Sequence, residues 1–216
     1  DYLRNRLEPN IHLTKGENMA DAADIHILVA GRPDRELFEA NKNLQTLIIP
    51  WTGIPPQTRK LAADFPQVAV HNLHHNAVPV AEMTATLLLA AAKNLIPLDA
   101  ALREGDWTLR YQDPAPSLTL NGKTVLILGY GEIGRRVAQI CHSLGMKVWA
   151  TKRSPFPEEI DLYAQEIVPP DKLHELLPLA QALVITLPLT PMTEGLIGDQ
   201  ELDLMPSDSI LINIGR

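Results

Sequence analysis

A short apolar run that leads into a glycine-rich turn constrains the fold of this chain more than any other stretch. Residues 124–128 read Thr-Val-Leu-Ile-Leu, and Gly129, Gly131 and Gly134 follow at the spacing Gly-x-Gly-x-x-Gly. An apolar run bounded by glycine is typical of a buried parallel strand, and the pattern over 133–144 predicts a helix directly after the turn. Strand, glycine turn and helix in this order predict the opening unit of a dinucleotide-binding α/β sheet.

Each residue of the turn has a physical role in that prediction. Gly129 allows the tight turn, Gly131 lets the backbone approach a pyrophosphate, and Gly134 lets the helix pack closely on the strand. The N–H groups near Glu132 and Ile133, at the start of the helix, would then face the anion. The alternative is a glycine turn in an α/β domain that binds no ligand.

The end of the next expected strand, residues 147–151, bears on the choice of cofactor. In NAD-binding proteins of this kind, an acidic residue about 20 positions past the glycines binds the adenine ribose 2′-hydroxyl. This chain has Lys152, Arg153 and Ser154 there and no carboxylate. An acidic side chain would repel a 2′-phosphate, whereas Lys and Arg pair with one. The sequence therefore favours NADP over NAD, the alternative being a solvated basic turn with NAD still bound.

The rest of the chain alternates strand and helix patterns, which implies an α/β architecture. Residues 1–75 are expected to form a small open sheet, and a second α/β unit begins near Lys123. Residues 96–121 are expected to be an irregular loop. Besides the glycine turn, strands are expected at residues 10–13, 25–30, 47–50, 68–71, 147–151, 182–187 and 209–214, and helices at residues 2–7, 35–40, 58–65, 77–95, 171–177 and 201–204.

Composition limits the partners of the chain. The net charge of −7 offers no basic surface for nucleic acid. The single cysteine, Cys141, excludes a disulfide framework and suits the cytoplasm. Residues 77–92 are apolar but include Glu82, and they fall short of the roughly 20 residues that a membrane span needs. We therefore expect a cytoplasmic protein without nucleic-acid or membrane partners.

A group of histidines, His71, His74 and His75, raises the question of a metal site. No Cys, Asp or Glu accompanies them in this stretch, and adjacent side chains of an extended segment point apart. No metal site is therefore expected. A role of His75 or Asn76 in lining a cleft and plain packing both stay open.

Several separated motifs resemble those of the D-isomer-specific 2-hydroxyacid dehydrogenases, and in particular the glyoxylate and hydroxypyruvate reductases. Residues 51–54, Trp-Thr-Gly-Ile, resemble the substrate loop of that family, and residues 76–82, Asn-Ala-Val-Pro-Val-Ala-Glu, resemble the opening of its interdomain helix. Six motifs in the order that the family has argue against a chance similarity. The other four resemblances lie at residues 103–107, 120–125, 187–193 and 211–216.

The resemblance implies hydride transfer between NAD(P)H and a small 2-oxo or 2-hydroxy acid. It implies a catalytic role for Arg216, whose guanidinium would bind the substrate carboxylate and polarise the C2 oxygen. It further implies that Thr52, Gly53, Ile54 and Asn76 bind the substrate. Beside the glycine turn and the basic turn, the residues that the resemblance assigns to the cofactor are Leu187, Pro188, Thr193, Asn213, Ile214 and Gly215.

The resemblance also implies how the chain is divided. Residues 1–75 would be the N-terminal part of a smaller, flavodoxin-like substrate domain, and residues 76–216 an incomplete Rossmann-type dinucleotide-binding domain through which the protein forms a homodimer. In this family the histidine that exchanges the proton and its glutamate partner follow the arginine signature. We therefore expect a chain truncated at its C-terminus and inactive by itself. The alternatives are an enzyme that resembles formate or phosphite dehydrogenase, and a non-catalytic NAD(P)-sensing protein.

Overall fold

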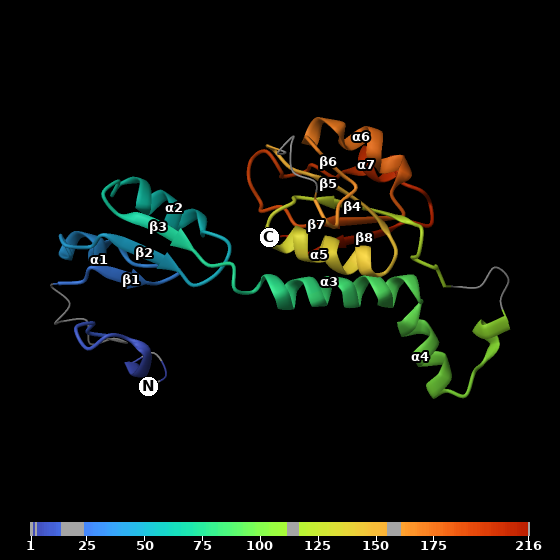
Figure 1. The fold of residues 1–216 in the computed structure, drawn as a ribbon, viewed down its shortest axis with the longest axis horizontal. Helices are drawn as coiled ribbons and strands as arrows, with labels where there is room; N and C mark the ends of the chain where they lie inside the picture. Colours follow the sequence, from blue (N-terminus) through green and yellow to red (C-terminus); the bar gives the residue numbers. More distant parts are fainter. Residues whose placement is uncertain (1, 3, 14–23, 112–116, 155–160, 216) are drawn as a thin grey trace. The chain divides into compact units, whose positions relative to one another are not determined.

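The computed structural model of the protein describes residues 2, 4–13, 24–111, 117–154 and 161–215. The chain folds into two compact units, Asp1–Leu73 and His74–Arg216 (Figure 1). Both units consist of parallel strands that alternate with helices, as the sequence predicts.

The first unit contains a three-stranded parallel sheet in the order β1-β2-β3. Leu47 and Ile49 of the central strand are fully buried and pack with Phe38 and Leu61 from the two helices. This small core defines the unit. In chain order its elements are a 3-10 helix (Arg4–Arg6), β1 (Ile27–Val29), α1 (Arg35–Ala40), β2 (Thr46–Ile49), α2 (Pro56–Ala63) and β3 (Ala69–Asn72).

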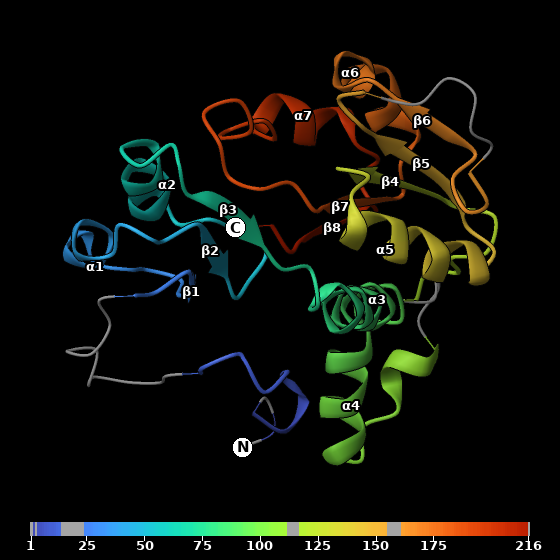
Figure 2. The ribbon, with the colours of Figure 1, turned by 60° about the vertical axis from the view of Figure 1, so that its left-hand side comes forward.

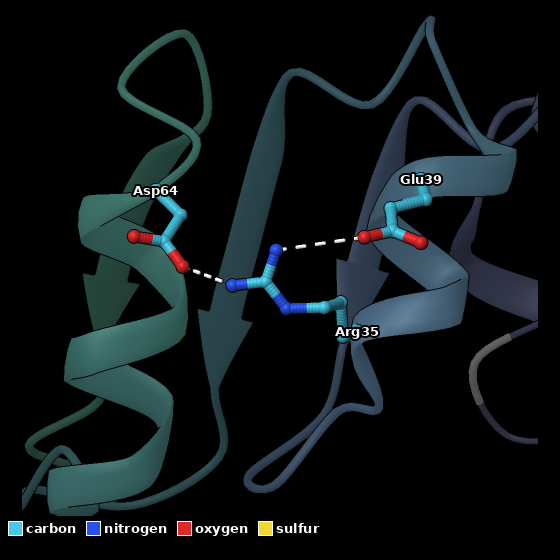
Figure 3. A network of polar contacts seen from close by, with 3 residues as sticks. All are labelled: Arg35, Glu39 and Asp64. Atoms are coloured by element: carbon cyan, nitrogen blue, oxygen red, sulfur yellow. Dashed lines mark hydrogen bonds and ion pairs between the residues drawn. The ribbon is translucent and has the colours of Figure 1, made fainter.

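An arginine on α1 ties that helix to the end of α2 (Figure 3). The guanidinium of Arg35 pairs with the carboxylate of Asp64, and its second terminal nitrogen lies 3.5 Å from Oε1 of Glu39. The same group lies 5.6 Å from the centre of the Phe65 ring. Because these charged side chains are about half exposed, each ion pair contributes at most about 1 kcal/mol. The network therefore stabilises the packing of the two helices of the first unit.

Two expectations for the start of the chain are wrong. Residues 11–13 are not a strand; the N–H of Ile11 instead donates to the carbonyl of Glu8 at 2.9 Å, which closes a turn, and the Ile11 side chain is exposed. The helix expected over residues 2–7 is a single 3-10 turn at Arg4–Arg6. Apolar residues alternate at 11–13, but a strand also needs a neighbouring strand to accept its hydrogen bonds.

The second unit contains a five-stranded, wholly parallel sheet in the order β6-β5-β4-β7-β8. Strand β4 is the middle strand of the sheet, and all five of its residues are buried. Chain order reverses between β4 and β7, which makes their carboxyl ends the switch point at which doubly wound sheets bind ligands. The strands are β4 (Thr124–Leu128), β5 (Lys147–Thr151), β6 (Glu166–Val168), β7 (Ala182–Ile185) and β8 (Ile210–Asn213).

Helices cover both faces of this sheet, as a parallel sheet requires (Figure 2). Val125 and Ile127 face the core formed with α3 and α5, whereas Leu126 and Leu128 face the core formed with α6 and α7. Short 3-10 helices at Thr108–Tyr111, Pro170–Lys172 and Leu177–Leu179 complete the connections. The helices are α3 (Ala77–Ala92), α4 (Leu95–Arg103), α5 (Glu132–Ser143), α6 (Leu173–Leu176) and α7 (Asp199–Leu204).

Helix α4 and strand β6 of this unit were not predicted from the sequence. Residues 96–121 are not irregular throughout, because α4 covers Leu95–Arg103; Asn94, in the left-handed region at φ 49°, ends α3, and Pro97 is tolerated in the first turn of α4. Strand β6 is only three residues long and pairs with β5 alone, so its sequence pattern is too short to stand out.

Only one stripe of α3 is buried. Ala81, Thr84, Leu88 and Ala92 recur at helical spacing and face α5, whereas Met83 and others are exposed. In the part of the chain that the structure describes, no single helix is long and apolar enough to cross a membrane. Helices α3 and α4, which are bent by 64° relative to each other, are together long and apolar enough, by length and composition only.

Candidate functional site

The glycine turn has the geometry that its spacing predicts. Gly129 has φ of 97°, a left-handed conformation that other residues rarely adopt. A Cβ at Gly134 would lie 2.1 Å from the carbonyl oxygen of Gly129, so helix α5 approaches the turn as closely as a glycine allows. A Cβ at Gly131 would meet nothing within 4 Å. Two glycines are thus required by the fold, and the third leaves open space above the turn.

The open space lies at the start of α5. Gly131 is the N-cap of this helix, and its carbonyl accepts the N–H of Arg135 at 2.9 Å. The N–H groups of the first turn, which include those of Glu132 and Ile133, have no acceptor within a helix and carry the positive end of its dipole. Glu132 is exposed and Ile133 half-buried. An open glycine, free N–H donors and a helix N-terminus fit a pyrophosphate.

The basic turn begins next to the glycine turn. The carbonyl of Thr151, the last residue of β5, accepts the N–H of Gly129 at 3.2 Å and that of Tyr130 at 3.0 Å. The following residue is held from the other side, because the N–H of Lys152 donates to Val168 of β6 at 2.9 Å. Lys152 is half-buried, while Arg153 and Ser154 are exposed. The structure therefore brings the two predicted parts of the cofactor site to adjacent strand ends.

A buried tyrosine inside the glycine turn, Tyr130, was not predicted as part of the site. The hydroxyl of Tyr130 donates a hydrogen bond of 2.6 Å to Oδ1 of Asp161. Burial, followed by this hydrogen bond and the negative charge of Asp161, raises the pKa of Tyr130 above its usual range. Burial also raises the pKa of Asp161, but its hydrogen bonds and the charge of Arg135 outweigh that effect and hold it below the usual value. The pair is therefore neutral tyrosine and ionised carboxylate at neutral pH.

A cavity of about 240 Å³ opens at the carboxyl ends of β4, β7 and β8. The hydroxyl of Thr193 donates to the carbonyl of Pro188 at 2.6 Å and accepts the N–H of Thr190 at 2.9 Å, so it shapes the loop from inside. A Cβ at Gly215 would lie 2.4 Å from the Leu187 carbonyl oxygen, which brings the two loops into contact. Five residues predicted to contact the cofactor line this cavity: Leu187, Pro188, Thr193, Asn213 and Gly215.

The remaining residue of that group, Ile214, donates its N–H to the carbonyl of Ile185 at 3.1 Å and extends the pairing of β8. Thr186, which was not among the predicted site residues, links this side of the site to the glycine turn. Its hydroxyl oxygen lies 2.6 Å from the carbonyl oxygen of Gly129 and 3.0 Å from that of Leu128. A hydroxyl residue directly after an apolar strand that neighbours the glycine-turn strand is the signal that could have identified it.

The predicted substrate loop lies in the first unit, after β2. The side-chain amide of Asn72, at the end of β3, donates to the carbonyl of Thr52 at 2.6 Å. A Cβ at Gly31 would lie 1.9 Å from the Trp51 ring, so the indole packs over that glycine. A Cβ at Gly53 would meet nothing within 4 Å, which leaves its backbone accessible, and Ile54 is half-buried. The loop is thus braced from β1 and β3.

The other predicted substrate residues are placed differently. Asn76 precedes α3 in the second unit, and its carbonyl accepts the N–H of Val80 at 3.1 Å. Arg216 lies outside the described residues, so its catalytic role stays a prediction. Among the residues that the structure describes, no group of three or more His, Cys, Asp and Glu side chains could hold a metal ion.

A model of the NAD-binding domain of the D-isomer specific 2-hydroxyacid dehydrogenases matches residues 85–216, which is more than half of the chain. The chain belongs to this dehydrogenase family. The matched region contains the glycine turn, the basic turn and the whole five-stranded sheet. The predicted family and the predicted class of cofactor, a nicotinamide dinucleotide, are therefore confirmed, whereas the choice between NADP and NAD is not decided.

This member of the dehydrogenase family is similar in sequence to curated glyoxylate reductases. The Aeropyrum pernix protein is 40% identical over 141 residues, which are 63% of this chain and 41% of that protein. The Thermococcus onnurineus protein is 29% identical over 204 residues, which are 93% of this chain and 60% of that protein. The chain thus spans about half the length of these relatives.

Solved structures of the family have the same fold. A D-isomer specific 2-hydroxyacid dehydrogenase family protein from Aeromonas salmonicida matches with a TM-score of 0.79 at 23% identity, over 100% of this chain and 68% of that chain. At this identity the likeness concerns the fold alone. It confirms the predicted α/β class with a Rossmann-type sheet.

Proposed function

We propose that the protein reduces a small 2-oxo acid, such as glyoxylate or hydroxypyruvate, to a 2-hydroxy acid with NADPH. The observation that carries the proposal is the open glycine turn at the switch point of the sheet in a member of this dehydrogenase family. The glyoxylate reductases among its relatives support the substrate class. When bound, the dinucleotide supplies the hydride that reaches C2 of the substrate.

The residues of this chain would hold and orient the reactants. The glycine turn and the N-terminus of α5 would bind the pyrophosphate, and the loops after β7 and β8 would line the nicotinamide side. The N–H groups of Thr52, Gly53 and Ile54, with Asn76, would bind the substrate. Arg216 would bind its carboxylate and withdraw electron density from the C2 oxygen, which makes C2 a better hydride acceptor.

A substrate panel tests the activity. Glyoxylate, hydroxypyruvate, formate and phosphite are each incubated with reduced or oxidised NADP and NAD, as their chemistry requires, and absorbance at 340 nm is followed on the protein at its natural length. We expect reduction of one of the two 2-oxo acids with NADPH, and loss of turnover in Arg216→Ala. Turnover of formate or phosphite alone, or of none of the four, would contradict the proposal.

The preference for NADPH rests on the basic turn. In Lys152→Asp/Arg153→Ala, two cationic partners of the 2′-phosphate are lost and a repelling carboxylate is added, so the NADPH-to-NADH affinity ratio should fall about 100-fold. Calorimetric titration with both dinucleotides measures the ratio.

The matched control for this variant is Lys147→Asp/Lys123→Ala. It makes the same change in net charge at the opposite ends of β4 and β5, and it should leave the ratio unchanged. Tighter binding of NADH than of NADPH by the unmodified protein would rule out the preference.

We also propose that the protein is a cytoplasmic homodimer. Exposed apolar side chains on α3, on α4 and at Trp107 support a protein partner, and Ile96 on α4 is 75% exposed. The free, buried Cys141 suits a reducing compartment. Among these exposed apolar residues are Met83, Leu87, Leu95, Ile96, Leu102 and Trp107.

Sedimentation velocity tests the dimer. A charge at an apolar interface is costly to bury, so Ile96→Asp should sediment as a monomer at concentrations at which the unmodified protein is a dimer. Leu179→Asp places the same charge on an exposed leucine after α6 and should stay dimeric. A monomeric unmodified protein would refute the proposal.

A further inference from the structure

The peptide group between Gly129 and Tyr130 is held by hydrogen bonds from both sides of strand β4. Its N–H, which belongs to Tyr130, donates to the carbonyl of Thr151 at the end of β5 at 3.0 Å. Its carbonyl, which belongs to Gly129, accepts the hydroxyl of Thr186, directly after β7, at 2.6 Å. Strands β5 and β7 are the two neighbours of β4 in the sheet. The orientation of this peptide in the glycine turn therefore depends on both.

The hydroxyl of Thr186 has one proton and two carbonyl oxygens within reach. The carbonyl of Leu128, 3.0 Å away, already accepts the backbone N–H of Thr186 at 2.9 Å. The carbonyl of Gly129 is closer, so it is the better acceptor for the proton. Thr186 is half-buried, and a carbonyl that loses its donor in such a place is costly.

The same carbonyl lies against the first turn of helix α5. A Cβ at Gly134 would be 2.1 Å from the Gly129 oxygen and 3.3 Å from the hydroxyl oxygen of Thr186. Gly129 has φ of 97°, and two residues later Gly131 is the N-cap of α5. Thr186 thus contacts the turn at the peptide from which the chain continues into the helix.

We propose that Thr186 is a positioning residue that holds the glycine turn in the conformation that accepts the pyrophosphate of the cofactor. This inference rests on the proposed dinucleotide-dependent function. The donors for the pyrophosphate are the N–H groups at the start of α5, and their direction follows from the backbone of the turn before them. A turn that is already in its bound conformation loses less entropy when the ligand binds.

A positioning role and a packing role predict opposite orders among the variants of Thr186. Thr186→Val keeps the branched shape of the side chain and removes the hydroxyl, whereas Thr186→Ser keeps the hydroxyl and removes a methyl group. If the hydrogen bond to Gly129 positions the turn, Thr186→Val should bind dinucleotides more weakly than Thr186→Ser. A side chain that only fills space would give the reverse order.

The experiment is calorimetric titration of the protein with NADPH and with NADH, which both carry the pyrophosphate. In Thr186→Val both affinities should fall about tenfold with little change in their ratio, and in Thr186→Ser both should stay within about twofold of the unmodified protein. Thr186→Ala differs from Thr186→Ser only by the hydroxyl, and its affinities should fall at least about tenfold.

The matched control is Thr84→Val. The hydroxyl of Thr84 donates to the carbonyl of Val80 at 2.7 Å within helix α3, so the same chemical change removes a hydroxyl-to-carbonyl hydrogen bond outside the glycine turn. Both affinities should be unchanged in this variant.

Each outcome decides between the roles. Unchanged affinities in Thr186→Val and Thr186→Ala, with the variants folded by circular dichroism, would overturn the positioning role while the proposed function stands. A larger fall in Thr186→Ser than in Thr186→Val, or an equal fall in Thr84→Val, would overturn it as well. If the unmodified protein bound neither dinucleotide, the proposed function would fail and this inference with it. Falls in Thr186→Val and Thr186→Ala alone would support the inference.

Discussion

Replacing Gly134 with alanine should lower the free energy of unfolding of the second unit by about 3 kcal/mol, the upper end of the usual cost of overpacking. The added Cβ would lie 2.1 Å from the carbonyl oxygen of Gly129, a backbone atom that cannot rotate away. Relief requires helix α5 to move away from β4, which disturbs the packing of Val137 and Ala138 in the core. Urea denaturation followed by circular dichroism measures the change.

The direction of the change in the free energy of unfolding caused by Gly134→Ala is itself a test. In an exposed helix, glycine to alanine stabilises by up to about 1 kcal/mol, because alanine is the better helix former. Unchanged or increased stability of Gly134→Ala would therefore contradict the close contact between α5 and the turn.

Replacing Gly131 with alanine should change the stability of the fold little and weaken dinucleotide binding strongly. Its added Cβ meets no protein atom, and its φ of −97° suits any residue, so the free energy of unfolding should fall by no more than about 1 kcal/mol, the cost of alanine at an N-cap. The methyl group would occupy the space in which we place the pyrophosphate. Affinity for a dinucleotide should therefore drop at least about tenfold, as measured by calorimetric titration.

These two substitutions control for each other. They make the same chemical change three residues apart in one turn, and we expect one to affect the fold and the other the binding of the ligand. If Gly131→Ala kept full affinity for the dinucleotide, the proposed position of the pyrophosphate at this turn would be wrong.

Much of the second unit could be predicted because its signals are local. The apolar run at 124–128 and the glycine spacing determine a strand, a turn and a helix within about twenty residues, and the structure confirms all three. Strand β6 and helix α4 were missed because one is very short and the other begins with Leu-Ile-Pro, which reads as a break. Their formation depends on neighbours that are distant in sequence.

The turns of the candidate site could be predicted from the sequence, whereas the side-chain hydrogen bonds that connect them to other elements could not. The glycine turn and the basic turn could be predicted because each is identified by residue type and by spacing along the chain. The contact between Tyr130 and Asp161 joins residues 31 positions apart, and Thr186 reaches Gly129 across 57 positions. No periodicity reports such pairs, because they arise only when β5 and β7 take their places on either side of β4.

The most direct test of the central claim, that the open glycine turn beside the basic turn holds NADPH, is a calorimetric titration of the unmodified protein with NADPH and NADH. We expect saturable binding of one dinucleotide per chain, with NADPH at least about tenfold tighter than NADH because of its extra charged contacts. Absence of binding by the folded protein, or tighter binding of NADH, would contradict the claim.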